Sequence, residues 1–96
     1  FVNDQAVLMA RAILREHAGS PTAQVDKVYW QTLSRPPERA ERKDCLQFLR
    51  MMADDHRQQL SGDNLSRDEL ASTIEARALE DLCHVAFNLN EFVFQQ

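Results

Sequence analysis

The stretch VDKVYWQTLSRPPERAE, Val25 to Glu41, sets the architecture expected for this chain. Side chains that suit a helix interior recur there every three or four positions, namely Val25, Val28, Tyr29, Thr32 and Leu33. The ring of Pro36 clashes with the backbone of the preceding residue, so Arg35 cannot continue a helix. The stretch therefore predicts an amphipathic helix that stops near Ser34, a sharp corner, and a second helix that begins around Pro37 to Arg39.

The composition of the 96 residues is typical of a small helical domain. Hydrophobic residues make up 44% and glycine occurs twice, while Ala, Leu, Gln, Glu and Arg are plentiful. The net charge of −4 argues against a nucleic-acid partner or an anionic membrane, because both require a concentrated basic face. No apolar stretch approaches the roughly 20 residues of a membrane span. We expect residues 1–96 to form a single all-α domain without membrane insertion.

Capping residues mark the first two helices. Asn3 is placed to cap a helix that runs to about His17, and Gly19 is typical of the left-handed residue after a helix end. Ser20 followed by Pro21 predicts the start of the second helix, with a hydroxyl cap and proline at the first helical position. The inner face of the first helix is expected to contain Ala6, Met9, Ala10 and Ile13.

The third helix is expected to bury one short face before a polar stretch. Its inner residues are Cys45, Phe48, Leu49 and Met52. The region from Ala53 to Leu65 is the most polar of the chain, and the turn-forming residues Ser61 to Asn64 predict a loop.

The fourth helix begins with a capping box formed by Ser66 and Glu69. Its apolar stripe consists of Leu70, Ile74, Ala78, Leu82, Val85, Ala86 and Leu89. We expect it to end near Asn88, with Phe92 to Phe94 as a tail that folds back on the core. Because short connections favour antiparallel neighbours, the predicted fold is a four-helix up-down antiparallel bundle with the last helix longest.

The two cysteines, Cys45 and Cys83, lie too far apart for a C-x-x-C metal or redox site. Cys83-His84 matches the end of a c-type haem attachment motif, but the first cysteine that the motif requires is replaced by Glu80, which excludes covalent haem here. Buried free thiols are the favoured interpretation, and a Cys45–Cys83 disulfide is the alternative in an exported protein.

Asp54, Asp55 and His56 are the one local group that suggests a metal. Consecutive residues on a helix point in different directions, so a solvated turn is the favoured interpretation and no metal site is predicted. His17 has no acidic or cysteine partner at helical spacing. His84 directly follows Cys83, and neighbouring side chains on a helix do not face each other as a Cys–His nucleophile requires. We predict no catalytic residue and no cofactor in this chain.

Three signatures occur in order: Asn3-Asp4, YWQTLSRPP and LEDLCHVAFNLNEFVF. Together they resemble the C-terminal part of a bacterial family of planctomycete proteins, domain-of-unknown-function family 1553. The family's leucine, small residue and Arg-Pro-Pro correspond to Leu33 to Pro37, and its closing Asn-x-Asn-Glu-Phe corresponds to Asn88 to Phe92. Where the family often has a threonine that would cap the third helix, this chain has Glu38, a weaker cap.

The resemblance implies a large, exported, multidomain parent protein, often with a c-type cytochrome domain upstream. It therefore implies an exported or periplasmic location, and haem only in other domains. It supplies no catalytic residue. The chain opens on Phe1 rather than methionine, which also favours a piece of a longer protein.

Arg35 places a long cationic side chain at the predicted corner between the second and third helices. We predict a structural tether in which Arg35 pairs with Glu91 and with carbonyls near Asn88; the alternative is that Arg35 is simply exposed. Replacing Arg35 by alanine or methionine should then destabilise the fold more than replacing Arg42. The predicted corner and tether comprise Arg35, Pro36, Pro37, Asn88, Asn90, Glu91 and Phe92.

The side chain of Trp30 lies about one hundred degrees around the helix from the inner residue Tyr29. An exposed Trp30 together with Phe94 or Phe1 would mark an interaction patch. We expect a non-catalytic structural or interaction module that binds other domains of its parent or another protein, or that associates with itself. The alternative is the C-terminal part of a hydrolytic or redox enzyme whose active site lies mainly upstream. An apolar patch would favour the first function, and a polar cleft with convergent ionisable residues the second.

Overall fold

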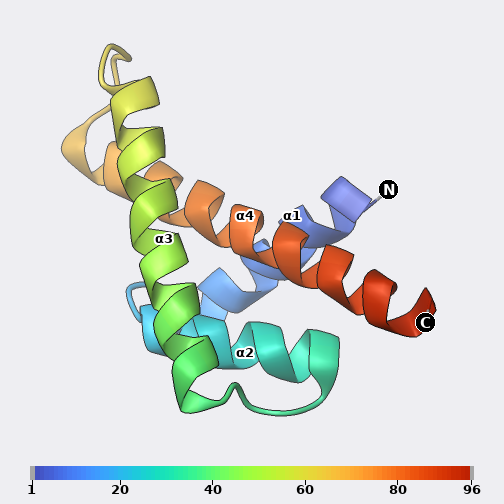
Figure 1. Ribbon diagram of the computed structural model, residues 1–96. Helices are drawn as coiled ribbons and strands as arrows, with labels where there is room; N and C mark the ends of the chain where they lie inside the picture. The colour runs from blue at the N-terminus through green and yellow to red at the C-terminus, as the bar shows by residue number, and fades with distance from the viewer. Residues whose placement is uncertain (1, 96) are drawn as a thin grey trace.

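A computed structural model describes the backbone of residues 2–95 and the side chains of residues 4–88. Four helices pack against one another, and no strand occurs within the described part (Figure 1). They are α1 (Val2–His17), α2 (Pro21–Leu33), α3 (Arg39–Leu60) and α4 (Arg67–Gln95). The all-α, four-helix prediction is confirmed.

The ends of α1 and α2 follow their local signals. Gly19 adopts a left-handed φ of 79° after α1, and Pro21 occupies the first turn of α2. Ser34 ends α2 with a φ of 56°, and its N–H donates to the carbonyl of Trp30 at 3.2 Å. Ser20 stands at the predicted N-cap position of α2, but its hydroxyl makes no cap hydrogen bond. The predicted Asn3 cap is wrong, because α1 begins at Val2 and Asn3 lies inside its first turn.

The start of α3 agrees with the sequence, but its length does not. Glu38 and Glu41 form a reciprocal capping box, which compensates for the weak intrinsic cap of Glu38. The helix continues to Leu60, through much of the stretch expected to be irregular. Leu60 is buried and Ala53 packs against the core. Packing thus overrides the polar composition of this segment.

The start of α4 is also as predicted, since Ser66 Oγ accepts a hydrogen bond from the Glu69 N–H at 3.1 Å. Its end is not, because the backbone remains helical past Asn88 to Gln95. The segment 67–95 contains neither glycine nor proline, and asparagine alone costs too little to stop a helix. The predicted tail over Phe92 to Phe94 is therefore wrong at the level of the backbone.

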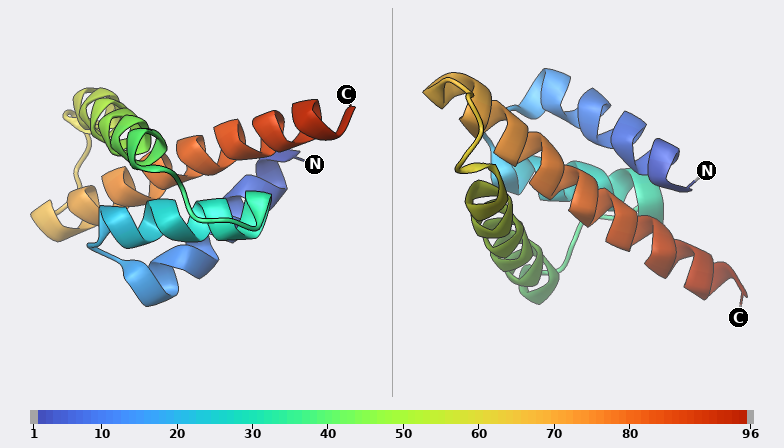
Figure 2. Two further views of the ribbon diagram at one scale, coloured as in Figure 1. Left: turned by 60° about the horizontal axis from the view of Figure 1, so that its bottom comes forward. Right: turned by 90° about the horizontal axis from the view of Figure 1, so that it is seen from above.

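The core forms around α4, which contacts all three other helices. Figure 2 shows α1 and α3 on opposite sides of α4, and α3 is steeply inclined to it. The largest fully buried side chains are Ile13, Val25, Val28, Leu79 and Cys83. The predicted inner faces are largely right, but Val85 is 41% exposed because α4 turns a neighbouring stripe, through Leu79 and Cys83, toward the core.

Within residues 2–95, no helix combines the length and the apolar character that crossing a bilayer requires.

Candidate functional site

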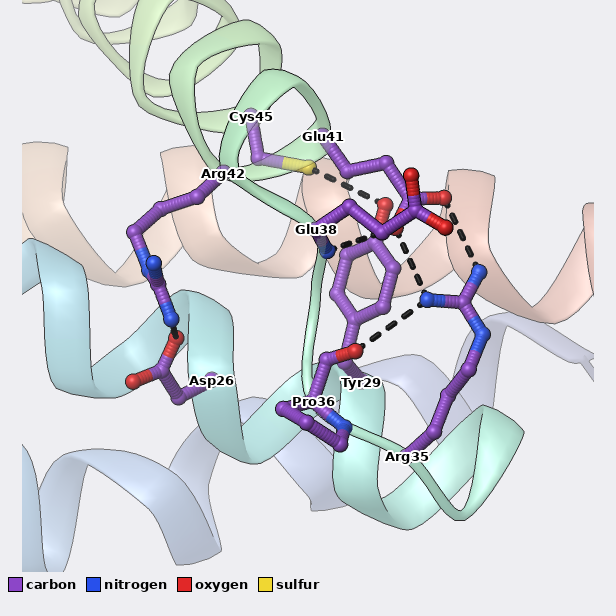
Figure 3. A network of polar contacts seen from close by, with 8 residues as sticks. All are labelled: Asp26, Tyr29, Arg35, Pro36, Glu38, Glu41, Arg42 and Cys45. Carbon is purple, nitrogen blue, oxygen red and sulfur yellow. Dashed lines mark hydrogen bonds and ion pairs between the residues drawn. The ribbon is translucent and has the colours of Figure 1, made fainter.

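The corner between α2 and α3 is built on a two-pronged ion pair (Figure 3). Arg35 Nη1 donates to Glu41 Oε1 at 2.8 Å, and Nη2 donates to Glu41 Oε2 at 2.9 Å. Nη1 also donates to the carbonyl of Pro36 at 3.1 Å. The guanidinium carbon lies 5.5 Å from the ring centroid of Tyr29, within cation–π range. One arginine thus connects the end of α2, the proline turn and the first turn of α3.

The ionisable groups of this corner are held in inactive forms. The Arg35 hydrogen bond, helped by the Glu38 N–H, lowers the pKa of Glu41 from 4.5 to about 2. Burial raises the pKa of Tyr29, and the thiol of Cys45, which donates to the Tyr29 hydroxyl at 3.8 Å, adds to this shift. Burial likewise raises the pKa of Cys45. A neutral phenol, a neutral thiol and a fixed carboxylate suit a structural role.

A second arginine braces the same two helices. Arg42 on α3 reaches back to Asp26 on α2, with Nε and Nη2 each 3.0 Å from Oδ1. Arg42 is therefore part of the corner and is not a neutral comparison for Arg35.

The structure assigns Arg35 a partner that sequence reasoning missed. The Glu38-x-x-Glu41 spacing is the signal that could have identified it, because it turns the Glu41 carboxylate back toward the corner. The predicted partner Glu91 lies outside the described side chains, as do Asn90 and Phe92, so the tether to the end of α4 stays a prediction. Of the other predicted corner residues, Pro37 is buried, and Pro36 and Asn88 are exposed.

A hollow of about 450 Å³ lies between α2, α3 and α4. Its floor is apolar and consists of Leu46, Leu49, Ala53, Ala71, Ile74 and Ala78. Pro21, Thr22 and Gln24 of α2 close one side, and the charged residues Arg50, Arg57 and Glu75 stand along it. We refer to this hollow as the α3/α4 groove. Its volume lies in the range of about 300–1,000 Å³ that ligand pockets occupy.

A hydrogen-bonded junction fixes one wall of the α3/α4 groove. Glu75 Oε2 accepts from the Gly19 N–H at 2.7 Å and from Gln24 Nε2 at 3.0 Å. Gln24 Nε2 also donates to the carbonyl of His17 at 3.0 Å, and Gln24 is only 2% exposed. Neither Gln24 nor Glu75 was predicted to have a role. Gln24 shares the inner face of α2 with Val28 and Thr32, a spacing that could have identified it.

The two arginines of the α3/α4 groove make fewer polar contacts than the Glu75 carboxylate. Arg57 Nη1 lies 2.7 Å from Asp54 Oδ1, in a pair that is largely exposed on both sides. Arg50 is exposed, and among the described side chains no carboxylate lies within 4.0 Å of it. The α3 edge of the groove therefore presents one guanidinium without a nearby carboxylate, at Arg50, and one whose carboxylate partner is exposed, at Arg57.

His56 lies on α3 rather than in the solvated turn that was predicted. Its Nε2 donates to Asp81 Oδ2 on α4 at 2.7 Å, and the buried Nδ1 has no hydrogen-bond partner among the described residues. Asp81 also borders a smaller hollow of about 320 Å³ with Phe48, Met52, His84, Val85 and Asn88. Across the described part of the chain, no three His, Cys, Asp or Glu residues converge as a metal site would require.

Both cysteines are free thiols, which agrees with the favoured prediction and not with the Cys45–Cys83 disulfide. Cys83 is completely buried, and this burial raises the pKa of its thiol to about 12.

Trp30 is 53% exposed, as expected for a residue turned away from the inner face of α2. Its predicted companions Phe94 and Phe1 lie outside the described side chains, so the interaction patch at this end of the molecule stays a prediction. Leu8 and Met51 are similarly exposed on α1 and α3.

Comparison of the chain with models of protein families, with curated proteins and with solved structures finds no match.

Proposed function

We propose that this domain is a non-catalytic interaction module that receives an amphipathic helix from another domain of its parent protein, or from another protein, in the α3/α4 groove. The observation that supports it is the groove's apolar floor between charged edges. Burying apolar side chains against such a floor is the main source of affinity in helix-in-groove recognition.

The dimensions of the groove favour a helix as the occupant. On α3 the lining residues run from Leu46 to Arg57, which corresponds to about 16 Å of helix. On α4 they run from Ala71 to Ala78, about 10 Å. A partner helix of two to three turns spans this length. The small side chains of Ala53, Ala71 and Ala78 leave room for its backbone to approach.

The titratable groups also support a binding role over chemistry. The carboxylate of Glu75 already accepts two hydrogen bonds, and Arg50 and Arg57 belong to the exposed edge. A hydrolytic or redox active site in upstream domains remains the alternative from sequence, and no feature of the described residues favours it.

Other parts of the proposal rest on the sequence. The exported, multidomain parent follows from the resemblance to domain-of-unknown-function family 1553. The proposed fold keeps the up-down antiparallel order with the last helix longest, and the short connections 18–20, 34–38 and 61–66 support the antiparallel order.

Binding of a designed helix tests this function. The probe is a fluorescein-labelled peptide with leucines at i, i+3, i+4 and i+7 and a polar face of balanced charge, titrated with the 96-residue chain and followed by anisotropy. The variant Ala71→Gln puts a polar side chain on the groove floor at an exposed helical position. Ala12→Gln on α1, which contributes nothing to the groove, is the matched control.

We expect saturable binding that weakens about fivefold in Ala71→Gln, the factor for roughly 1 kcal/mol of lost apolar contact, and that is unchanged in Ala12→Gln. Absence of binding, or equal loss in both variants, would refute the proposed function.

A further inference from the structure

We propose that the helix received by the α3/α4 groove carries carboxylates along one edge only, the edge that faces α3. This inference rests on the proposed function and specifies the chemical class of its partner.

The two cations on α3 form a ladder. Arg50 and Arg57 are seven residues apart, which places them on the same face of α3 about 10 Å from each other. A partner helix that lies along α3 can match them with two acidic residues seven positions apart in its own sequence, and the one opposite Arg57 shares or replaces the exposed Asp54 partner. Arginine suits this role because its planar fork accommodates a carboxylate.

The opposite edge carries the reverse charge. Glu75 stands on α4, and its position is fixed by the Gly19 N–H and the buried Gln24 side chain. A second carboxylate brought against this edge would be repelled by it. The groove therefore distinguishes the two edges of an incoming helix, and so also favours one of its two orientations.

The surrounding molecule strengthens this selectivity. The chain as a whole has a charge of −4, so the α3 edge is a local positive site on an acidic protein. The net negative charge disfavours an acidic helix on average, whereas Arg50 and Arg57 offer it a local attraction. Charge complementarity of this kind acts on specificity and on association rate more than on total affinity.

A set of four helical peptides with the same leucine stripe tests the inference. The first peptide has two glutamates seven residues apart on the edge that faces α3, and the second has them on the opposite edge. The third and fourth peptides replace the two glutamates of the first by lysine and by glutamine, respectively. Binding to the 96-residue chain is measured by anisotropy at about 0.01 M and about 0.15 M ionic strength, where the screening length changes from about 30 to 8 Å. The protein variants are Arg50→Gln combined with Arg57→Gln, and Arg11→Gln on α1 as the control.

We expect the peptide with glutamates on the α3-facing edge to bind more tightly than the glutamine peptide at low salt, by about 1.5- to 5-fold for each arginine. This gain should shrink at the higher ionic strength, disappear in the double variant and persist in Arg11→Gln. The lysine peptide should bind most weakly of the four.

Three results would overturn the inference, and the first of them leaves the function on which it rests intact. Equal affinity for all four peptides would refute the preference for carboxylates on the edge that faces α3. The groove would then still bind a helix, but without regard to its charge. No binding by any of the four peptides overturns both the inference and the proposed function. Light scattering that shows a dimer, with the peptides competing for its interface, would assign the groove to a second copy of this chain and would also overturn the inference.

Discussion

Removal of the Glu75 carboxylate should loosen the packing of α4 against the turn between α1 and α2. In Glu75→Ala, the Gly19 N–H and one of the two N–H groups of Gln24 Nε2 lose their acceptor. The two N–H donors differ in whether water can take the place of the lost carboxylate. The Gly19 bond is exposed, so water can substitute, whereas Gln24 is nearly inaccessible and keeps only the carbonyl of His17.

The magnitude follows from these two environments. A hydrogen bond to a charged group contributes about 1.5–3 kcal/mol when it is protected from solvent, and a typical bond about 1 kcal/mol. We assign about 1.5 kcal/mol to the partly buried Gln24 bond and about 0.5 kcal/mol to the exposed Gly19 bond. The loss of about 2 kcal/mol should lower Tm by about 8–16 °C for a domain of this size.

Urea and thermal unfolding followed by circular dichroism measure this change. Glu80→Ala on the same helix is the control, because Glu80 accepts no hydrogen bond from the described residues. A double-mutant cycle with Gln24→Ala should give a coupling of at least about 0.5 kcal/mol. If Glu75→Ala and Glu80→Ala unfold alike, or if the coupling is zero, the junction has no energetic role and the reasoning is wrong.

Three further predictions concern the core, the corner and the thiols. Leu79→Ala removes a completely buried side chain of α4, so the free energy of unfolding should fall by about 3 kcal/mol in urea titration; a loss below about 1 kcal/mol would contradict the packing. The lowered pKa of Glu41, about 2 instead of 4.5, stabilises the fold above pH 4.5, and this contribution is lost as the pH falls toward 2. The Tm difference between wild type and Glu41→Gln should therefore be largest above pH 4.5 and should vanish near pH 2; a difference that does not vary with pH would refute the ion pair. In the native protein, iodoacetamide should modify Cys45 slowly and Cys83 only on unfolding, as mass spectrometry can determine; equal rates would contradict the burial of Cys83.

Local signals in the sequence predicted the features that depend on neighbouring residues. The proline ring acts on the residue before it, so the end of α2 and the corner at Arg35 could be placed. The Ser66 cap and the helical spacing through Val25 and Val28 are local in the same sense, and the structure confirms them.

Features that depend on distant residues could not be predicted in this way. Nothing near Ala53 indicates that α3 continues to Leu60, because packing of that segment against other parts of the fold supplies the stabilisation. Glu75 and Gln24 are separated by 51 positions, and their hydrogen bond exists only once the helices have packed. The α3/α4 groove is likewise a product of the steep inclination of α3, which periodicity does not specify.

Mapping the binding site by NMR tests the central claim most directly. The ¹⁵N-labelled 96-residue chain would be titrated with the peptide that carries glutamates on the α3-facing edge. Backbone amide shifts should concentrate at Leu49, Ala53, Ala71 and Ile74 and should leave Leu8 and Trp30 unchanged. Shifts that gather around Leu8 or Trp30, or none at saturating peptide, would contradict the proposed role of the α3/α4 groove.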